Sequence, residues 1–128
     1  MVFVFGSNEA GIHGSGAAKY ALDKEGAVFG GSFGLQGNSF AIPTKSVCGQ
    51  CVGDTLPLEA IKKYVDGFLF FAECSPESKF KVTQVGCGLA GLKASDMAPM
   101  FVNAPDNCYF DTAWAEYLPG KNFWGTFE

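Results

Sequence analysis

Two units of the same kind most constrain this chain: each is a buried strand, a glycine-rich segment and a helix in succession. Val2–Phe5 is a continuous run of β-branched and aromatic residues, as expected of a strand buried on both faces. A glycine-rich segment at 11–16 follows, and then a predicted helix that closes near Gly26. A second strand, 80–85, leads into the glycine-rich segment 86–91 and a further helix.

The rest of the chain continues this alternation of strands and helices. Residues 39–43 have strand character, and an apolar stripe at helical spacing over 58–72 predicts a long helix. A short helix is predicted from about 95 to 103, and a strand at 107–110. The pattern predicts an α/β fold with a mainly parallel sheet flanked by helices, in one domain that spans residues 1–128.

Three segments lack a clear period. Residues 26–37 are rich in Gly, Phe and Ser and are predicted to form a loop, and residues 46–54 form a polar connection that contains Cys48 and Cys51. The tail from 112 to 128 is rich in aromatic residues. We expect it either to pack over the sheet or to serve an oligomer contact, and the oligomeric state stays open.

Charge limits the classes of ligand. The net charge is −4, and all nine basic residues are lysines. Duplex nucleic acid needs a basic face, usually with arginine forks, so this class of partner is disfavoured. A bound phosphate would depend mainly on backbone N–H groups, which glycine-rich turns at helix starts expose. The composition therefore favours a nucleotide-sized anion.

Five cysteines without a secretory leader predict a reducing, cytoplasmic setting, and no apolar run approaches the roughly 20 residues that cross a membrane. Cys74, Cys87 and Cys108 lie in apolar sequence and are expected to be small core residues. Cys48 and Cys51 form a C-x-x-C pair, a pattern compatible with redox or metal chemistry. Since zinc needs four ligands and no second paired spacing exists, we expect no metal and interpret the pair as incidental.

Both glycine-rich segments and the Thr44-Lys45 pair follow predicted parallel strands. Ligands of such sheets bind in the crevice outside the carboxyl ends of the strands. At Gly14-Ser15-Gly16 the missing Cβ atoms and the first N–H groups of a helix would let a diphosphate approach, although a plain tight turn would look the same. No G-K-[ST] follows, so this is not a Walker loop. The second glycine-rich segment, Gly86–Gly91, strengthens the prediction of a phosphate-binding site at this edge of the sheet.

Three stretches resemble the ligand loops of one macrodomain branch. They are Asn8–Gly16 (N-E-A-G-I-H-G-S-G), Pro43–Lys45 (P-T-K) and Gly86–Met100 (G-C-G-L-A-G-L-K-A-S-D-M-A-P-M). The branch contains ADP-ribosyl glycohydrolases of the DarG type and of the terminal ADP-ribose protein glycohydrolase type. The match runs in order through most of residues 2–110. It implies a three-layer macrodomain-like fold whose ligand is ADP-ribose or an ADP-ribosylated substrate, with no cofactor.

The resemblance implies that Lys45 is the catalytic residue. An amine in a partly apolar cleft loses some preference for its charged form, and a neutral amine can attack C1″ of the opened distal ribose. A charged Lys45 would instead stabilise a leaving group or hold a phosphate. An ordinary surface lysine after a strand is the remaining alternative.

The predicted ligand-binding set combines the glycine pattern with the resemblance. It comprises Asn8, Gly14, Ser15, Gly16, Thr44, Gly86, Cys87, Gly88, Leu89, Ala90 and Gly91. Asn8 matches an asparagine that contacts the distal ribose, and a turn-forming asparagine is the alternative. The eukaryotic members carry an aspartate at the place of Ala90 that resolves the lysine adduct, whereas DarG-like members do without it.

His13 is the only histidine and lies inside the first ligand loop. Its ordinary pKa suits a general acid or base, so it is a second catalytic candidate beside Lys45. The resemblance does not carry this role, and a polar loop residue is the alternative.

Three functions follow as expectations. The first is an ADP-ribosyl hydrolase that acts through Lys45. The second is a non-catalytic module or sponge for ADP-ribose or an NAD-derived nucleotide, as a phage could use against host defence. The third is a phosphatase acting on ADP-ribose 1″-phosphate, a reaction that macrodomains in general can host.

Overall fold

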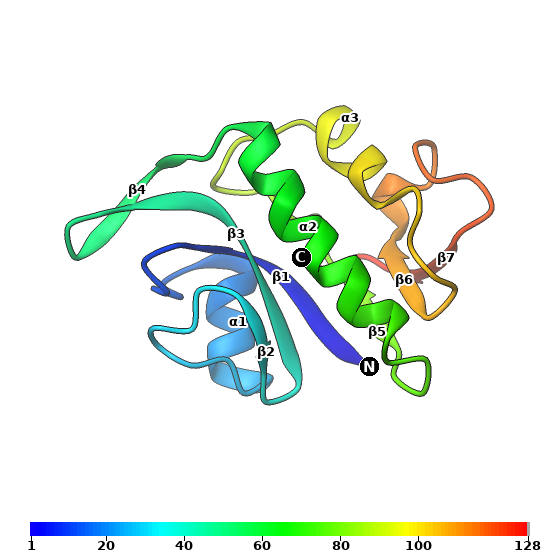
Figure 1. The fold of residues 1–128 in the computed structure, drawn as a ribbon, viewed down its shortest axis with the longest axis horizontal. Helices are drawn as coiled ribbons and strands as arrows, with labels where there is room; N and C mark the ends of the chain where they lie inside the picture. The colour runs from blue at the N-terminus through cyan, green and yellow to red at the C-terminus, as the bar shows by residue number, and fades with distance from the viewer. Residues whose placement is uncertain (128) are drawn as a thin grey trace.

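The computed structural model describes residues 1–127 and shows a seven-stranded sheet with helices on both faces (Figure 1). The strands are β1 (Val2–Asn8), β2 (Gly34–Gln36), β3 (Ser39–Cys48), β4 (Cys51–Thr55), β5 (Phe80–Val82), β6 (Cys108–Asp111) and β7 (Asn122–Gly125). The helices are α1 (Gly16–Lys24), α2 (Leu58–Glu73) and α3 (Ala94–Met97), with 3₁₀ turns η1 (Ala98–Phe101) and η2 (Thr112–Trp114). None of the helices in the described residues is long and apolar enough to cross a membrane.

The sheet has the order β2-β3-β1-β5-β6-β7, and β4 also pairs with β3. The central pairs β1–β3 and β1–β5 are parallel, as are β5–β6 and β6–β7, whereas β2 and β4 run antiparallel to β3. The prediction of an α/β fold with a mixed, mainly parallel sheet is confirmed.

Alternation along the strands builds one core on each face of the sheet. In β1, Val4 belongs to the larger core, which α2 and α3 cover, while its neighbours Phe3 and Phe5 belong to the smaller core beneath α1. Adjacent strand residues point to opposite faces, so a fully apolar strand is what a sheet covered on both sides requires. Figure 1 shows α1 and α2 on different sides of the sheet. The three layers follow from this pattern.

Four segments differ from the predicted elements. The strand predicted at 80–85 ends at Val82. The tail packs Trp114 and Leu118 into the larger core, as expected of a segment that lies over the sheet, and it also adds β7 to the sheet edge. Residues 46–54 are not an irregular connection, because β3 continues to Cys48 and turns back as β4. The predicted loop 26–37 contains the short strand β2.

Two smaller expectations are wrong. The helix expected at about 95–103 is a four-residue α-helix followed by a 3₁₀ turn, and Pro99, which has no N–H to donate, lies at the start of that turn. Cys74 is exposed at the C-cap of α2 rather than part of a core. Cys108 is buried, as expected, and Cys87 is half-buried.

Candidate functional site

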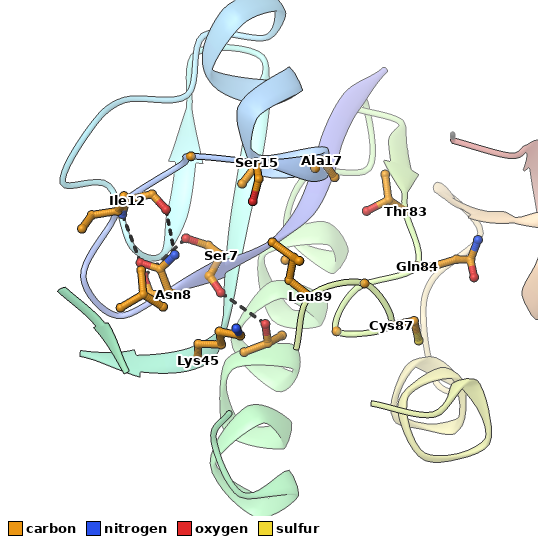
Figure 2. Close-up of a pocket in the computed structure, with 18 of the residues that line it drawn as sticks. Ser7, Asn8, Ile12, Ser15, Ala17, Lys45, Thr83, Gln84, Cys87 and Leu89 are labelled. Atoms are coloured by element: carbon orange, nitrogen blue, oxygen red, sulfur yellow. Dashed lines mark hydrogen bonds between the residues drawn. The ribbon is translucent and has the colours of Figure 1, made fainter. Parts of the chain in front are cut away.

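A cavity of about 490 Å³ opens at the carboxyl end of β1. Its lining comes from four segments that are far apart in the sequence: Gly6–Ala18, the β3–β4 hairpin, the loop after β5, and Phe127. Figure 2 shows Asn8, Lys45 and Leu89, one from each of the first three segments, around this space. The convergence expected from the strand–loop–helix units is therefore present.

Asn8 ends β1 and holds the first loop closed. Its side-chain Nδ2 donates to the carbonyl of Ile12 at 2.8 Å, and its Oδ1 accepts from the Ile12 amide at 3.0 Å (Figure 2). Both polar ends of the amide are thus engaged with the loop. Asn8 lines the cavity, but its side chain stabilises the loop backbone. Its contacts are those of a turn-forming asparagine, the alternative to a ligand contact.

The N-terminus of α1 lies at the cavity, and the first amides of a helix have no partner within the helix. Ser15 is the N-cap residue, and its side chain makes no capping hydrogen bond. The first turn holds no acidic residue, so no carboxylate of the helix competes for the amides. Gly14, Ser15, Gly16 and Ala17 all line the cavity. Free N–H groups and the positive end of the helix dipole together favour an anion at this point.

Gly14 leaves room for close approach. A Cβ atom built on Gly14 would meet nothing within 4 Å, and its φ lies outside the left-handed region. The backbone therefore does not require glycine there. What the missing side chain provides is open space beside the first amides of α1.

Lys45 lies within β3 and pairs with Asn8 at the end of β1. Its carbonyl accepts from the Glu9 amide at 2.9 Å, which fixes its backbone against β1. Its side chain is half-buried and is the only charged one among the described residues that line the cavity. No described residue forms a salt bridge or a side-chain hydrogen bond with it. The ammonium group is thus available to a ligand.

Thr44 precedes Lys45 and is buried. Its Oγ1 donates to the Ser7 carbonyl at 3.2 Å, a bond that joins β3 to β1 beside the cavity (Figure 2). Thr44 lines the cavity as predicted, but its hydroxyl proton serves this interstrand bond.

The second glycine loop folds back on itself. The Leu92 amide donates to the Gly86 carbonyl at 2.9 Å, and the Gly91 amide donates to the Gly88 carbonyl at 2.9 Å. Gly86 has φ +82°, and a Cβ there would lie 3.1 Å from Leu92 and 3.2 Å from the Met97 sulfur. Glycine is therefore needed at 86 for conformation and for space. Gly88, by contrast, faces open space.

The structure divides the predicted residues of this loop. Gly86, Cys87, Gly88 and Leu89 line the cavity, and the Leu89 side chain is 74% exposed at its mouth. Ala90 and Gly91 do not line it. The Ala90 carbonyl instead accepts from Thr55 Oγ1 at 2.9 Å, which ties the loop to β4. Ala90 thus anchors the loop through its backbone carbonyl.

Cys87 is a poor nucleophile in this setting. Its thiol lies 3.8 Å from the Val85 carbonyl, to which it donates a weak hydrogen bond. Burial raises the pKa of the Cys87 thiol, and the nearby Trp114 side chain only partly opposes this. The protonated thiol therefore forms part of the wall.

His13 lies away from the cavity. Its ring is buried in the smaller core and packs edge-on against Phe5, with ring centroids 5.3 Å apart. Neither ring nitrogen has a hydrogen-bond partner among the described residues. Burial lowers the pKa of His13, and polar groups of Val28, Gly31 and Gln36 only partly oppose this. The structure does not bring His13 and Lys45 together at the cavity, because the His13 ring is buried against Phe5.

Phe127 is a wall residue that the sequence did not reveal. Its ring packs edge-on against Phe3 and Tyr20, with centroid distances of 5.4 and 5.2 Å. Its amide donates to Asp111 Oδ2 at 3.1 Å. Because the contact depends on β7 joining the sheet, no local pattern near Phe127 could have signalled it.

Asp111 is a fully buried carboxylate that fastens this C-terminal segment. It accepts hydrogen bonds from Ala113 N at 2.9 Å, Thr126 Oγ1 at 3.1 Å and Gln84 Nε2 at 3.3 Å, besides the Phe127 amide. Gln84 itself lines the cavity. One carboxylate thus joins the loop after β5 to the segment that carries Phe127.

Among the described residues, the cavity lining offers hydrogen-bond donors and one cationic side chain. No group of three or more His, Cys, Asp or Glu side chains in residues 1–127 is placed to hold a metal ion. None of the described lining residues is an aspartate, glutamate or histidine. An anionic ligand would meet the α1 amides, the glycine loop backbone and Lys45 without an opposing carboxylate.

Comparison with known proteins adds no relative. No protein-family model, curated protein or solved structure matches this chain.

Proposed function

We propose that this protein binds ADP-ribose or a closely related ADP-ribosyl conjugate in the cavity and hydrolyses the conjugate through Lys45. The observation that carries the proposal is the meeting of Lys45 with both glycine loops and the α1 N-terminus around one space. A volume of about 490 Å³ lies within the range of small-molecule sites.

The diphosphate would lie against backbone amides. The exposed N–H groups at Ser15, Gly16 and Ala17 and the backbone at Gly88 supply donors without side-chain obstruction. A chain without arginine can bind a diphosphate in this way, since fixed backbone donors replace the guanidinium fork.

Phe127 offers an aromatic surface to the base of the nucleotide. Phe127 lines the cavity and is held by Phe3, Tyr20 and Asp111, so its ring is fixed before a ligand arrives. A preorganised aromatic ring loses little side-chain entropy when it contacts a flat heterocycle. This supports a nucleotide over a simple sugar phosphate.

Lys45 would act at the distal ribose. Its neutral amine attacks C1″ of the opened sugar, the linked group departs, and water then releases the sugar and restores the amine. The half-buried position and the lack of a carboxylate partner among the described residues leave the side chain free to contact the sugar.

A non-catalytic binding module is the second candidate. It is favoured by one specific observation: the described lining residues include no carboxylate or imidazole that would activate water for the release step. The position where an adduct-resolving aspartate would be expected is Ala90, which is bound to Thr55. Binding without turnover is the outcome that this alternative predicts.

A thermal-shift titration followed by turnover assays tests the proposal. ADP-ribose at about a hundredfold excess over Kd should stabilise the fold by about 2.7 kcal/mol, and ribose 5-phosphate should stabilise it far less. ADP-ribosylated protein, ADP-ribosylated DNA and ADP-ribose 1″-phosphate are then incubated separately with the protein. Release of ADP-ribose from either ADP-ribosylated substrate supports the hydrolase. Stabilisation without release supports the binding module, and inorganic phosphate released from the last compound alone would indicate a phosphatase.

A further inference from the structure

The tip of the β3–β4 hairpin carries two thiols that the cavity does not use. Cys48 and Cys51 are Cα partners in the antiparallel register, on either side of the turn Gly49-Gln50. Gly49 has φ +63° at the first central position, as in a type II′ hairpin turn. Directly opposed residues of a hairpin project from the same face, so the two thiols are neighbours.

The geometry of the pair suits a disulfide. Opposed Cβ atoms in an antiparallel pair are about 4.5 to 5.5 Å apart, and a disulfide brings them to about 3.5 to 4.5 Å. The adjustment needed is on the order of 1 Å. Both cysteines are exposed, so neither access of a reagent nor core packing opposes this movement.

The other cysteines cannot form an equivalent pair. Cys87 is half-buried and Cys108 is buried, and burial raises the pKa of both thiols, that of Cys108 to about 12. Cys74 is exposed but stands alone at the end of α2. Chemistry that needs two accessible, adjacent thiols is therefore confined to the hairpin tip.

A metal site at the tip is less well supported. Residues 1–127 contain no group of three or more His, Cys, Asp and Glu side chains arranged around a common point. Two thiolates alone leave a tetrahedral zinc ion half coordinated, whereas they are sufficient for a disulfide.

We propose that Cys48 and Cys51 form a redox-active dithiol that exchanges with low-molecular-weight disulfides. One thiolate attacks a sulfur of the external disulfide and releases one thiol, leaving a mixed disulfide on the protein. The second cysteine then displaces the other external thiol and forms the Cys48–Cys51 bond. The protein loses two hydrogens, and the external disulfide is reduced to two thiols.

Closure of this bond stiffens a wall of the cavity. The next pair along the hairpin is Val47 and Val52, and Val52 lines the cavity. Lys45 pairs with Thr55 further along the same two strands. A covalent link at the tip holds these pairs in register, and this consequence is independent of which ligand the cavity accepts.

Oxidised glutathione added to the reduced, full-length protein tests the proposal. We expect the main product to be a monomer whose intact mass falls by two hydrogens, with the bond mapped to Cys48–Cys51. Amide hydrogen exchange at 46–55 should slow severalfold, while exchange in α2 stays the same. Cys51→Ser should instead hold glutathione at Cys48, and Cys74→Ser should react as the wild type does.

Three results would overturn the proposal. One is independent glutathione addition at Cys48 and Cys51 in the wild type without closure. Another is a disulfide that links two chains. The third is protection of both thiols by zinc ions shared between two copies, which native mass measurement would reveal, because the pair would then be half of a metal site.

Discussion

Asn8 and Lys45 are opposite one another where β1 and β3 run in parallel, at a register shift that begins between Ser7 and Asn8. The shift places Asn8, the last residue of β1, beside Lys45, which lies inside β3. Asn8 braces the first glycine loop and Lys45 presents an amine to the cavity, so one irregular pairing sets the distance between the loop and the amine.

Lys45→Ala should separate binding from turnover. The side chain makes no salt bridge with the described residues, so we expect a stability change within about 1 kcal/mol. Turnover of ADP-ribosylated protein or DNA, measured by release of ADP-ribose, should fall at least about 100-fold. Lys63→Ala, which removes the same charge from an exposed position of α2, is the control. Equal loss of activity in both variants would remove Lys45 from the mechanism.

Gly86→Ala should destabilise the fold. A side chain at φ +82° is strained, and its Cβ would press on Leu92 and Met97. We expect a loss of about 2 kcal/mol in the free energy of unfolding, measured by denaturant titration. Gly88→Ala, in open space of the same loop, should change stability by less than about 0.5 kcal/mol. If the two substitutions cost the same, the loop does not have the described conformation.

His13 should make stability depend on pH below its ordinary pKa. Burial lowers the pKa of His13 in the folded state from 6.5. Below that pH the unfolded chain therefore binds a proton that the folded chain does not bind. Above pH 6.5 His13 therefore does not reduce the free energy of unfolding, and as the pH falls below that value the free energy of unfolding decreases. Thermal denaturation of wild type and His13→Phe between about pH 7 and pH 5 measures the effect. The substitution should flatten the profile, and an unchanged slope would show that other groups cause it.

Asp111→Asn should loosen the C-terminal segment. Asparagine keeps only one acceptor oxygen, so it cannot accept both the Ala113 bond made at Oδ1 and the Thr126 and Phe127 bonds made at Oδ2. We expect a stability loss of about 2 to 4 kcal/mol and weaker ADP-ribose binding, because Phe127 is no longer held at the cavity. Asp54→Asn removes the same charge from an exposed site and should leave stability unchanged. Intact affinity in Asp111→Asn would show that Phe127 does not contact the ligand.

The strands and their connection to the cavity were predictable because they depend on local patterns. The apolar run Val2–Phe5 specifies a strand buried on both faces, and the structure places its side chains alternately in two cores. The glycines at 14–16 and 86–88 mark loops that follow parallel strands. Loops at the carboxyl ends of parallel strands meet at one edge of the sheet, and both of these loops line the cavity.

The features that escaped prediction depend on contacts that no local pattern encodes. The hairpin at 46–55 is exposed and polar, so its sequence resembles that of a loop. His13 lies in a glycine-rich segment, but its ring is buried edge-on against Phe5, a contact between the loop and β1 that the local sequence does not encode. Phe127 reaches the cavity because β7 joins the sheet beside β6 and because Asp111 holds the segment.

Isothermal titration of ADP-ribose into the wild type and Gly88→Val tests whether the cavity binds a diphosphate beside the second glycine loop. The added side chain meets no protein atom within 4 Å of its Cβ and should fold normally, yet it occupies the space that a diphosphate needs. We predict one saturable site in the wild type and at least about a tenfold weaker Kd in the variant, equivalent to 1.4 kcal/mol. No heat of binding to the wild type at millimolar ADP-ribose, or equal affinity in both proteins, would show that the cavity does not bind ADP-ribose at this loop.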